Sequence, residues 1–93
     1  MPEKESFDKR WVEFTETFNR DYPTFHRNLF DHSPYLTRQD TRIAKLIKAG
    51  FSTEQIADFL DVGKTSVHMA RHRLREHLGL DALVDLTTFL QSM

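Results

Sequence analysis

The fold of this chain is decided by residues 52–78, which read STEQIADFLDVGKTSVHMARHRLREHL. The first part, Ser52 to Leu60, opens on a Ser-x-x-Gln capping pattern and carries apolar side chains at the spacing of an amphipathic helix. The second part, Lys64 to Leu78, is a longer basic helix that Gly79 closes. Only Asp61-Val62-Gly63 separates the two helices. This layout predicts a helix-turn-helix, whose second helix enters the major groove of DNA.

The sequence around this pair predicts further helices. Thr37 followed by Asp40 is a weaker capping pattern for a helix that begins after Thr37. Gly50 is placed to end that helix in a left-handed conformation. A last helix is predicted from about Asp81 to Gln91. We therefore expect an all-α protein, with a four-helix bundle over residues 36–93 that contains the helix-turn-helix.

The first 35 residues are expected to form a separate, aromatic-rich helical extension. After a solvated lead-in at residues 1–6, four aromatic side chains recur at spacings of four, three and four: Phe7, Trp11, Phe14 and Phe18. A second short helix should end near His32-Ser33-Pro34. We expect packing within the chain for Phe18, Tyr22, Phe25 and Leu29, and contact with a partner for Phe7 and Trp11.

Charge is distributed unevenly along the chain, although the net charge is only −1. Residues 1–36 hold five Lys/Arg and seven Asp/Glu, residues 37–80 hold eight and five, and residues 81–93 hold none and two. The middle segment is therefore +3, between flanks of −2 each. Local charge sets the field that a phosphate experiences, so this mild basic excess favours a nucleic-acid partner.

Several classes of protein are excluded by what the sequence lacks. It has no run of about 18 apolar residues, which excludes a spanning helix and membrane contact from this segment. It has no cysteine, which excludes disulfides and thiol zinc sites and fits a reducing cytoplasm, so we expect a cytoplasmic protein. Paired carboxylates in a pocket pattern and glycine-rich phosphate loops are also missing, so we expect neither catalytic residues nor a cofactor.

The basic helix carries two histidines at a spacing that suits metal ligands. His68 and His72 lie four residues apart and could share a metal ion. Glu76 is the only further ligand at helical spacing and brings the number to three at most. We therefore predict no metal site.

The order and spacing of apolar, glycine and hydroxyl positions over residues 36–90 resembles the LuxR-type (GerE-type) helix-turn-helix. The resemblance rests on Leu36-Thr37-Arg38, Ile43 to Ile47, Gly50-Phe51-Ser52, Ile56-Ala57, Leu60, Val62, Thr65-Ser66-Val67, Leu74 and Leu78-Gly79. The wider likeness is to C-terminal output domains of Bacteroidetes-type transcription regulators. The resemblance implies a sequence-specific DNA-binding domain, double-stranded DNA as partner, and an upstream sensor or helical-repeat region in a longer protein.

The chain departs from the family pattern at two places. Gly63 stands where the family usually has a capping Ser or Thr, which weakens the cap by a few tenths of a kcal/mol. The outward face of the basic helix carries His68, Met69 and His72 in place of a lysine-rich set. A target sequence therefore cannot be transferred from the family.

The basic helix divides into a core face and a DNA face at 100° per residue. Val67, Ala70, Leu74 and Leu78 should face the core, and Ala70 should let the preceding helix approach closely. For the DNA face we predict base contacts by His68, Met69 and His72 and phosphate contacts by the remaining polar residues. These are Lys64, Thr65, Ser66, Arg71, Arg73 and Arg75. Arg71 could instead pair with Asp58 or Asp61, and Arg73 with acids of the last helix.

Apolar residues of the predicted last helix cover more than half of its circumference, which exceeds the need of one core contact. The resemblance to the LuxR-type family implies that this helix forms a dimer interface. We therefore predict a homodimer on DNA through Leu83, Val84 and Leu86. The alternative is that the surplus packs on the aromatic N-terminal helices. A rival function also stays open, namely a protein-interaction or dimerisation module that reads no bases.

Overall fold

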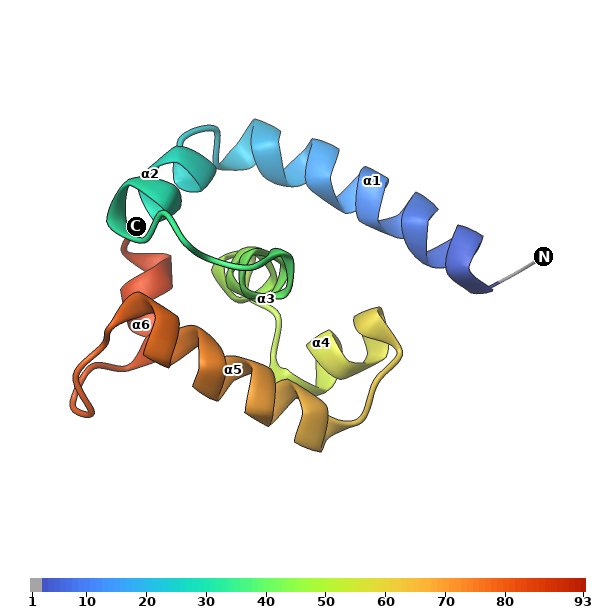
Figure 1. Ribbon diagram of the computed structural model, residues 1–93. Coiled ribbons are helices and arrows are strands. Elements are labelled where there is room, and N and C mark those ends of the chain that lie inside the picture. The colour runs from blue at the N-terminus through green and yellow to red at the C-terminus, as the bar shows by residue number, and fades with distance from the viewer. Residues whose placement is uncertain (1–2) are drawn as a thin grey trace.

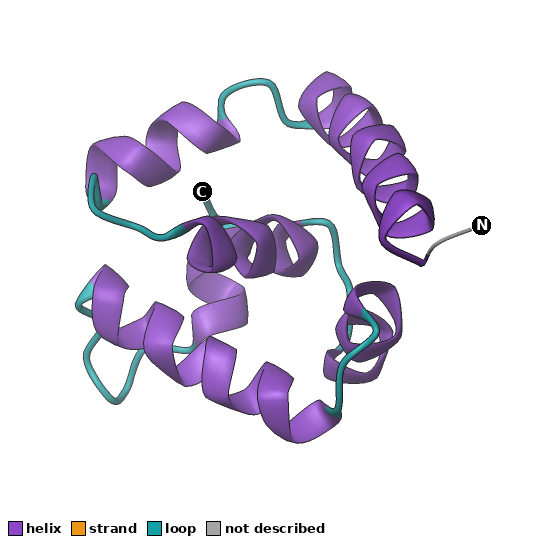
Figure 2. Ribbon diagram, turned by 45° about the vertical axis from the view of Figure 1, so that its right-hand side comes forward, coloured by secondary structure: helices purple, strands orange, loops and turns teal. Residues whose placement is uncertain are grey.

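The computed structural model describes residues 3–93, with side chains from Phe7 onward, and this part of the chain contains helices and no strand. Six helices follow one another along the described residues, and the other five surround α3 (Figures 1 and 2). Their bounds are α1 Glu3–Asp21, α2 Phe25–His32, α3 Arg38–Lys48, α4 Thr53–Leu60, α5 Lys64–Leu78 and α6 Leu86–Gln91. The all-α fold class predicted from the sequence is confirmed. Helix α1 already begins at Glu3, within the lead-in predicted for residues 1–6, whose first two residues lie outside the described part.

The predicted capping patterns set the starts of α3 and α4. Thr37 accepts a hydrogen bond from the N–H of Asp40, whose carboxylate accepts one from the N–H of Thr37, both at 3.0 Å. Ser52 and Gln55 form the same reciprocal pair before α4, at 2.8 and 3.1 Å. Because each pair satisfies two N–H groups that the helix leaves unpaired, both helices begin where the sequence predicts.

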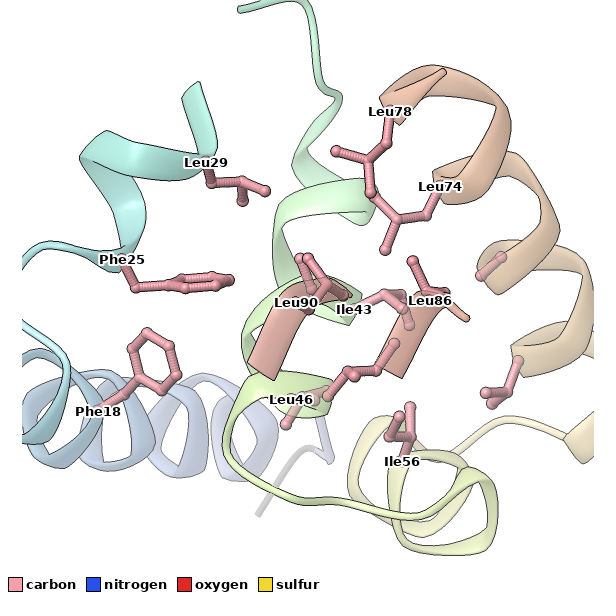
Figure 3. Packing of buried hydrophobic residues seen from close by; sticks show 14 of the residues in the cluster. Phe18, Phe25, Leu29, Ile43, Leu46, Ile56, Leu74, Leu78, Leu86 and Leu90 are labelled. Carbon is pink, nitrogen blue, oxygen red and sulfur yellow. The ribbon is translucent and has the colours of Figure 1, made fainter. Parts of the chain in front are cut away.

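The core is built on α3, whose Ile43, Ala44, Leu46 and Ile47 are 0–1% exposed. Helices α5 and α6 pack against it, and α4 packs against α5. Each fully buried Ile or Leu side chain contributes roughly 1.5–3 kcal/mol to the stability of the fold. Figure 3 shows that Phe18, Phe25 and Leu29 of the first two helices reach the same core. The predicted packing of these three residues within the chain is therefore confirmed.

The predicted partner contact of Phe7 and Trp11 is wrong, because both rings pack on the chain's own α4. The ring centroids of Phe7 and Trp11 lie 6.3 and 6.2 Å from that of Phe59, in edge-on geometry. Phe14 joins the same group, 5.7 Å from both Phe59 and Phe51. Edge-to-face pairs at this distance are favourable contacts. The aromatic stripe thus seats α1 against the helix-turn-helix.

The last helix is shorter than predicted, because it begins at Leu86 and not near Asp81. Asp85 is its N-cap, and its carboxylate accepts hydrogen bonds from the N–H and hydroxyl of Thr88 at 2.9 and 3.0 Å. These hydrogen bonds lower the pKa of Asp85, and the charges of Arg71 and Arg75 lower it further. Residues 81–85 form a loop. The wide apolar arc inferred for this segment therefore does not exist, since Leu83 and Val84 are not helical.

Leu86 was predicted to lie in a dimer interface, and the structure places it in the core of the protomer. Its side chain is 2% exposed and belongs to the same buried cluster as Ile43 and Leu46 (Figure 3). It faces inward because it occupies the first turn of α6, after the loop has ended. Leu83, 95% exposed, and Val84, 37% exposed, remain on the surface.

Candidate nucleic-acid interface

Helix α5 presents the predicted division into a buried and an exposed face. Val67, Ala70, Leu74 and Leu78 are 0–6% exposed and belong to the core. Ala70 lies on the side of α5 that packs against α3 and α4, as its small side chain predicts. The opposite side points away from the rest of the chain, along the lower edge of the molecule in Figure 1. The helix is therefore anchored along its length while one face stays open.

The open face carries the three residues that the sequence predicts to read bases. His68, Met69 and His72 are all exposed, and Met69 has 52% of its surface accessible. Together with Arg73 and Glu76 they line a shallow surface depression of about 320 Å³. Glu76 lies 3.5 Å from the imidazole of His72, in an i,i+4 pair. The open face thus presents two imidazole rings, a thioether, a guanidinium and a carboxylate.

The N-terminal turn of α5 is also open. Gly63 precedes the helix in extended conformation and, having no side chain, provides no cap for the N–H groups of Lys64, Thr65 and Ser66. The side chains of these three residues are exposed. Uncapped N–H groups at a helix start, with the positive end of the helix dipole, suit an anion such as phosphate.

Lys64 forms the ion pair that holds this turn to α4. Its ammonium lies 3.3 Å from a carboxylate oxygen of Glu54, and more than half of each side chain is exposed. Such exposed pairs contribute only about 0–1 kcal/mol. Lys64 can therefore exchange Glu54 for a phosphate at little cost.

Arg75 and Arg71 make contacts that the sequence did not reveal. Arg75 donates hydrogen bonds to the carbonyl oxygens of Val84 and Asp81, at 2.6 and 2.9 Å. Arg71 donates to the hydroxyl of Thr87 at 3.2 Å. Both arginines are partly buried against the loop and α6. The ion pairs considered for Arg71 with Asp58 or Asp61, and for Arg73 with acids of the last helix, do not occur among the described side chains.

A contact between α5 and α3 was also missed. The Nδ1 atom of His77 lies 2.5 Å from the carboxylate of Asp40, which is 3% exposed. The same carboxylate caps α3 through Thr37. Asp40 and His77 are 37 residues apart, so helical periodicity contains no signal for their pairing. This contact fixes the C-terminal half of α5 relative to the start of α3.

No group of three or more His, Cys, Asp or Glu side chains along the described residues is arranged to hold a metal ion. Among helices α1–α6, none combines the length and apolarity needed to cross a bilayer.

Comparison with known proteins agrees with the helix-turn-helix geometry. Residues 34–90 match the family model described as bacterial regulatory proteins, luxR family (GerE). This range contains α3, α4, α5 and nearly all of α6. No curated protein and no solved structure matches the chain significantly. The match covers more than half of the chain and includes the whole helix-turn-helix described above. The chain belongs to the luxR family of bacterial regulatory proteins and contains its DNA-binding helix-turn-helix domain.

Proposed function

We propose that α5 is a recognition helix that enters the major groove of double-stranded DNA and reads its sequence. The observation that carries this proposal is the open face of α5, where His68, Met69 and His72 are exposed while the opposite side is locked into the core. A recognition helix needs both properties, because base contacts require a rigid helix with free side chains. The segment then acts as the output domain of a transcription regulator with an upstream sensor or helical-repeat region.

Base reading is assigned to the centre of the open face. The imidazoles of His68 and His72 donate to acceptors such as the N7 and O6 atoms of guanine, and Met69 makes an apolar contact with a thymine methyl group. The carboxylate of Glu76, beside His72, disfavours a phosphate at this place and accepts a hydrogen bond from a cytosine amino group. The centre of the helix is thus suited to bases and its ends to the backbone.

Phosphate binding is assigned to the N-terminal turn and to Arg73. Lys64, Thr65 and Ser66 surround the uncapped helix start, and Arg73 is exposed on the flank of the helix. Arg71 and Arg75 have a smaller share in this role than the sequence suggested. Their guanidinium groups are hydrogen-bonded to α6 and to the preceding loop. They therefore add positive charge near the DNA but are less available to donate to a phosphate oxygen.

Dimerisation is proposed to use the loop that precedes α6. Leu83 is 95% exposed and Val84 is 37% exposed, next to each other at one end of α5. A homodimer related by a two-fold axis would place two copies of α5 on adjacent half-sites. Each half-site then adds its contacts to one complex, which offsets the modest positive charge of a single domain.

The proposal is tested by measuring the affinity for a random-sequence duplex as a function of salt. Neutralising phosphates releases counterions, so the logarithm of the binding constant should fall linearly with the logarithm of salt. Lys64→Ala should reduce the slope by about one unit. The matched control is Lys9→Ala, on the exposed surface of α1, which should leave the slope unchanged. A protein-interaction module without base reading would show no binding to the duplex at low salt.

A further inference from the structure

A cavity of about 260 Å³ that is open to solvent lies between α1, α2 and α3. Its lining combines aromatic rings with basic side chains: Trp11, His26, Phe30, Arg38, Arg42 and Lys45. None of the described lining residues carries a carboxylate, and none comes from α5. The cavity is therefore separate from the proposed DNA face, and it gathers positive charge around an apolar wall.

The cationic side chains of α3 form one stripe along that helix. Arg38, Arg42 and Lys45 are spaced by four and three residues, which places them on the same face. No described carboxylate forms an ion pair with any of the three. The guanidinium of Arg42 lies over the ring of Trp11, 5.4 Å from its centroid. Like charges on one helix face repel one another by a few tenths of a kcal/mol, so a bound anion would stabilise this stripe.

Lys45 is the most unusual member of the stripe because its side chain is only 8% exposed. Its ammonium lies 6.0 Å from the centroid of Phe18, at the outer limit of a cation–π contact. Burial lowers the pKa of Lys45, and the pKa of His26 is lowered by burial and then by the charge of Lys45. The ammonium itself reaches the solvent of the cavity and is only partly desolvated, and no described carboxylate pairs with it. An anion in the cavity would supply a counter-charge.

We propose that this cavity binds a small organic anion, namely a carboxylate or phosphate carried on a flat apolar body. Lys45, Arg42 and Arg38 would hold the anionic group, since ammonium and guanidinium groups make the strongest hydrogen bonds with carboxylates and phosphates. The rings of Trp11 and Phe30 would pack on the apolar body. The volume fits a compound of about one ring, because drug-sized ligands occupy roughly 300–1,000 Å³.

The test uses the fluorescence of Trp11, which is the only tryptophan in the chain and lines the cavity. Benzoate and phenyl phosphate are the anionic probes, while benzamide lacks the charge and inorganic phosphate lacks the ring. Both anionic probes should change the Trp11 emission saturably and raise the melting temperature. Benzamide and inorganic phosphate should bind at least roughly tenfold more weakly, a difference of about 1.4 kcal/mol.

Substitutions separate a ligand-binding role of Lys45 from a structural one. Lys45→Met should weaken both anionic probes at least roughly tenfold, while the exposed control Lys9→Met leaves them unchanged. Arg38→Gln changes an exposed residue of the same cavity and decides the test if Lys45→Met does not fold. The proposal is overturned if neither anionic probe saturates, if benzamide or inorganic phosphate binds equally well, or if the folded cavity variants bind like the wild type.

Discussion

The guanidinium of Arg75 donates a hydrogen bond of 2.6 Å to the carbonyl oxygen of Val84. A second hydrogen bond from the same guanidinium, at 2.9 Å, reaches the carbonyl oxygen of Asp81. These two bonds hold the loop of residues 81–85 against α5. A residue that helical periodicity places with the DNA contacts is therefore also part of the fold.

Arg75→Ala should consequently lower the stability of the domain. Two carbonyl groups lose a charged donor, and because they are near the surface we expect a loss of about 1–2 kcal/mol in the free energy of unfolding. Urea denaturation followed by circular dichroism measures this change. Arg73→Ala is the matched control, since Arg73 is exposed, and it should alter the stability by less than about 0.5 kcal/mol.

The two variants should show the opposite order in DNA binding. Arg73→Ala should flatten the salt dependence by about one unit of slope, because one phosphate contact is lost. Arg75→Ala should flatten it by less. A larger loss of slope for Arg75→Ala than for Arg73→Ala would show that Arg75 leaves the loop to bind phosphate.

Ala70→Leu should damage the fold as well as DNA binding. Ala70 is 6% exposed on the packed side of α5, so a larger side chain would push neighbouring helices apart. Overpacking of this kind costs roughly 1–3 kcal/mol, a large share of the stability of a small domain. Thermal denaturation measures the effect, with the exposed Ala82→Leu as control. An unshifted melting temperature for Ala70→Leu would contradict close packing at this position.

Lys45→Met should stabilise the protein in the absence of ligand, because it replaces a partly desolvated ammonium with an apolar side chain of similar length. We expect a gain of less than about 1 kcal/mol at pH 7, because solvent screens part of the desolvation penalty. Burial lowers the pKa of Lys45 from its ordinary value of 10.5, so the folded state binds this proton more weakly than the unfolded state does. The penalty in the wild type is therefore fully present at neutral pH and shrinks as the pH rises toward 10.5.

Chemical denaturation of both proteins between pH 7 and pH 10 checks this sign. The difference in free energy of unfolding between Lys45→Met and the wild type should become smaller as the pH rises. A difference that is constant with pH, or a destabilised Lys45→Met, would mean that the charge of Lys45 is compensated within the fold.

Leu83→Glu should abolish cooperative binding to a duplex with two half-sites and leave binding to one half-site intact. Leu83 is 95% exposed, so the substitution does not disturb the core. At a two-fold contact the introduced carboxylate would face the same carboxylate of the second copy, and the two charges would repel each other. Circular dichroism should show unchanged helicity. Leu83→Ser, which adds no charge, is the comparison variant. Persistent cooperativity in Leu83→Glu would place the dimer contact elsewhere.

Much of the helix-turn-helix could be predicted from the sequence because its signals are local. Helix α5 runs from Lys64 to Leu78 as predicted, since glycines flank it and its apolar residues keep the helical period. Each capping pair before α3 and α4 lies within four consecutive residues, so it can likewise be predicted from a short stretch of sequence. Local hydrogen bonds of this kind do not depend on the rest of the fold.

The errors arose where distant segments decide the conformation. Leu83 and Val84 belong to the apolar pattern from which a helix was predicted, yet Arg75 holds the carbonyl groups of Asp81 and Val84 in a loop. The partner contact predicted for Trp11 failed because Phe59, 48 positions later in the sequence, occupies that ring face. The cationic stripe of α3 is visible in the sequence, but such a stripe usually faces solvent. Only the positions of α1 and α2 turn it into a cavity wall.

The central claim is that the open face of α5 reads bases, and selection of bound duplexes from a random pool tests it most directly. The wild type should enrich one consensus sequence. Met69→Ala and His72→Ala should each change the preference at one or two base pairs by roughly 1–3 kcal/mol, while affinity for nonspecific duplex hardly moves. Lys64→Ala, a phosphate-contact variant, should keep the wild-type consensus at lower affinity. An identical consensus from wild type, Met69→Ala and His72→Ala, or no enrichment by the wild type, would contradict the claim.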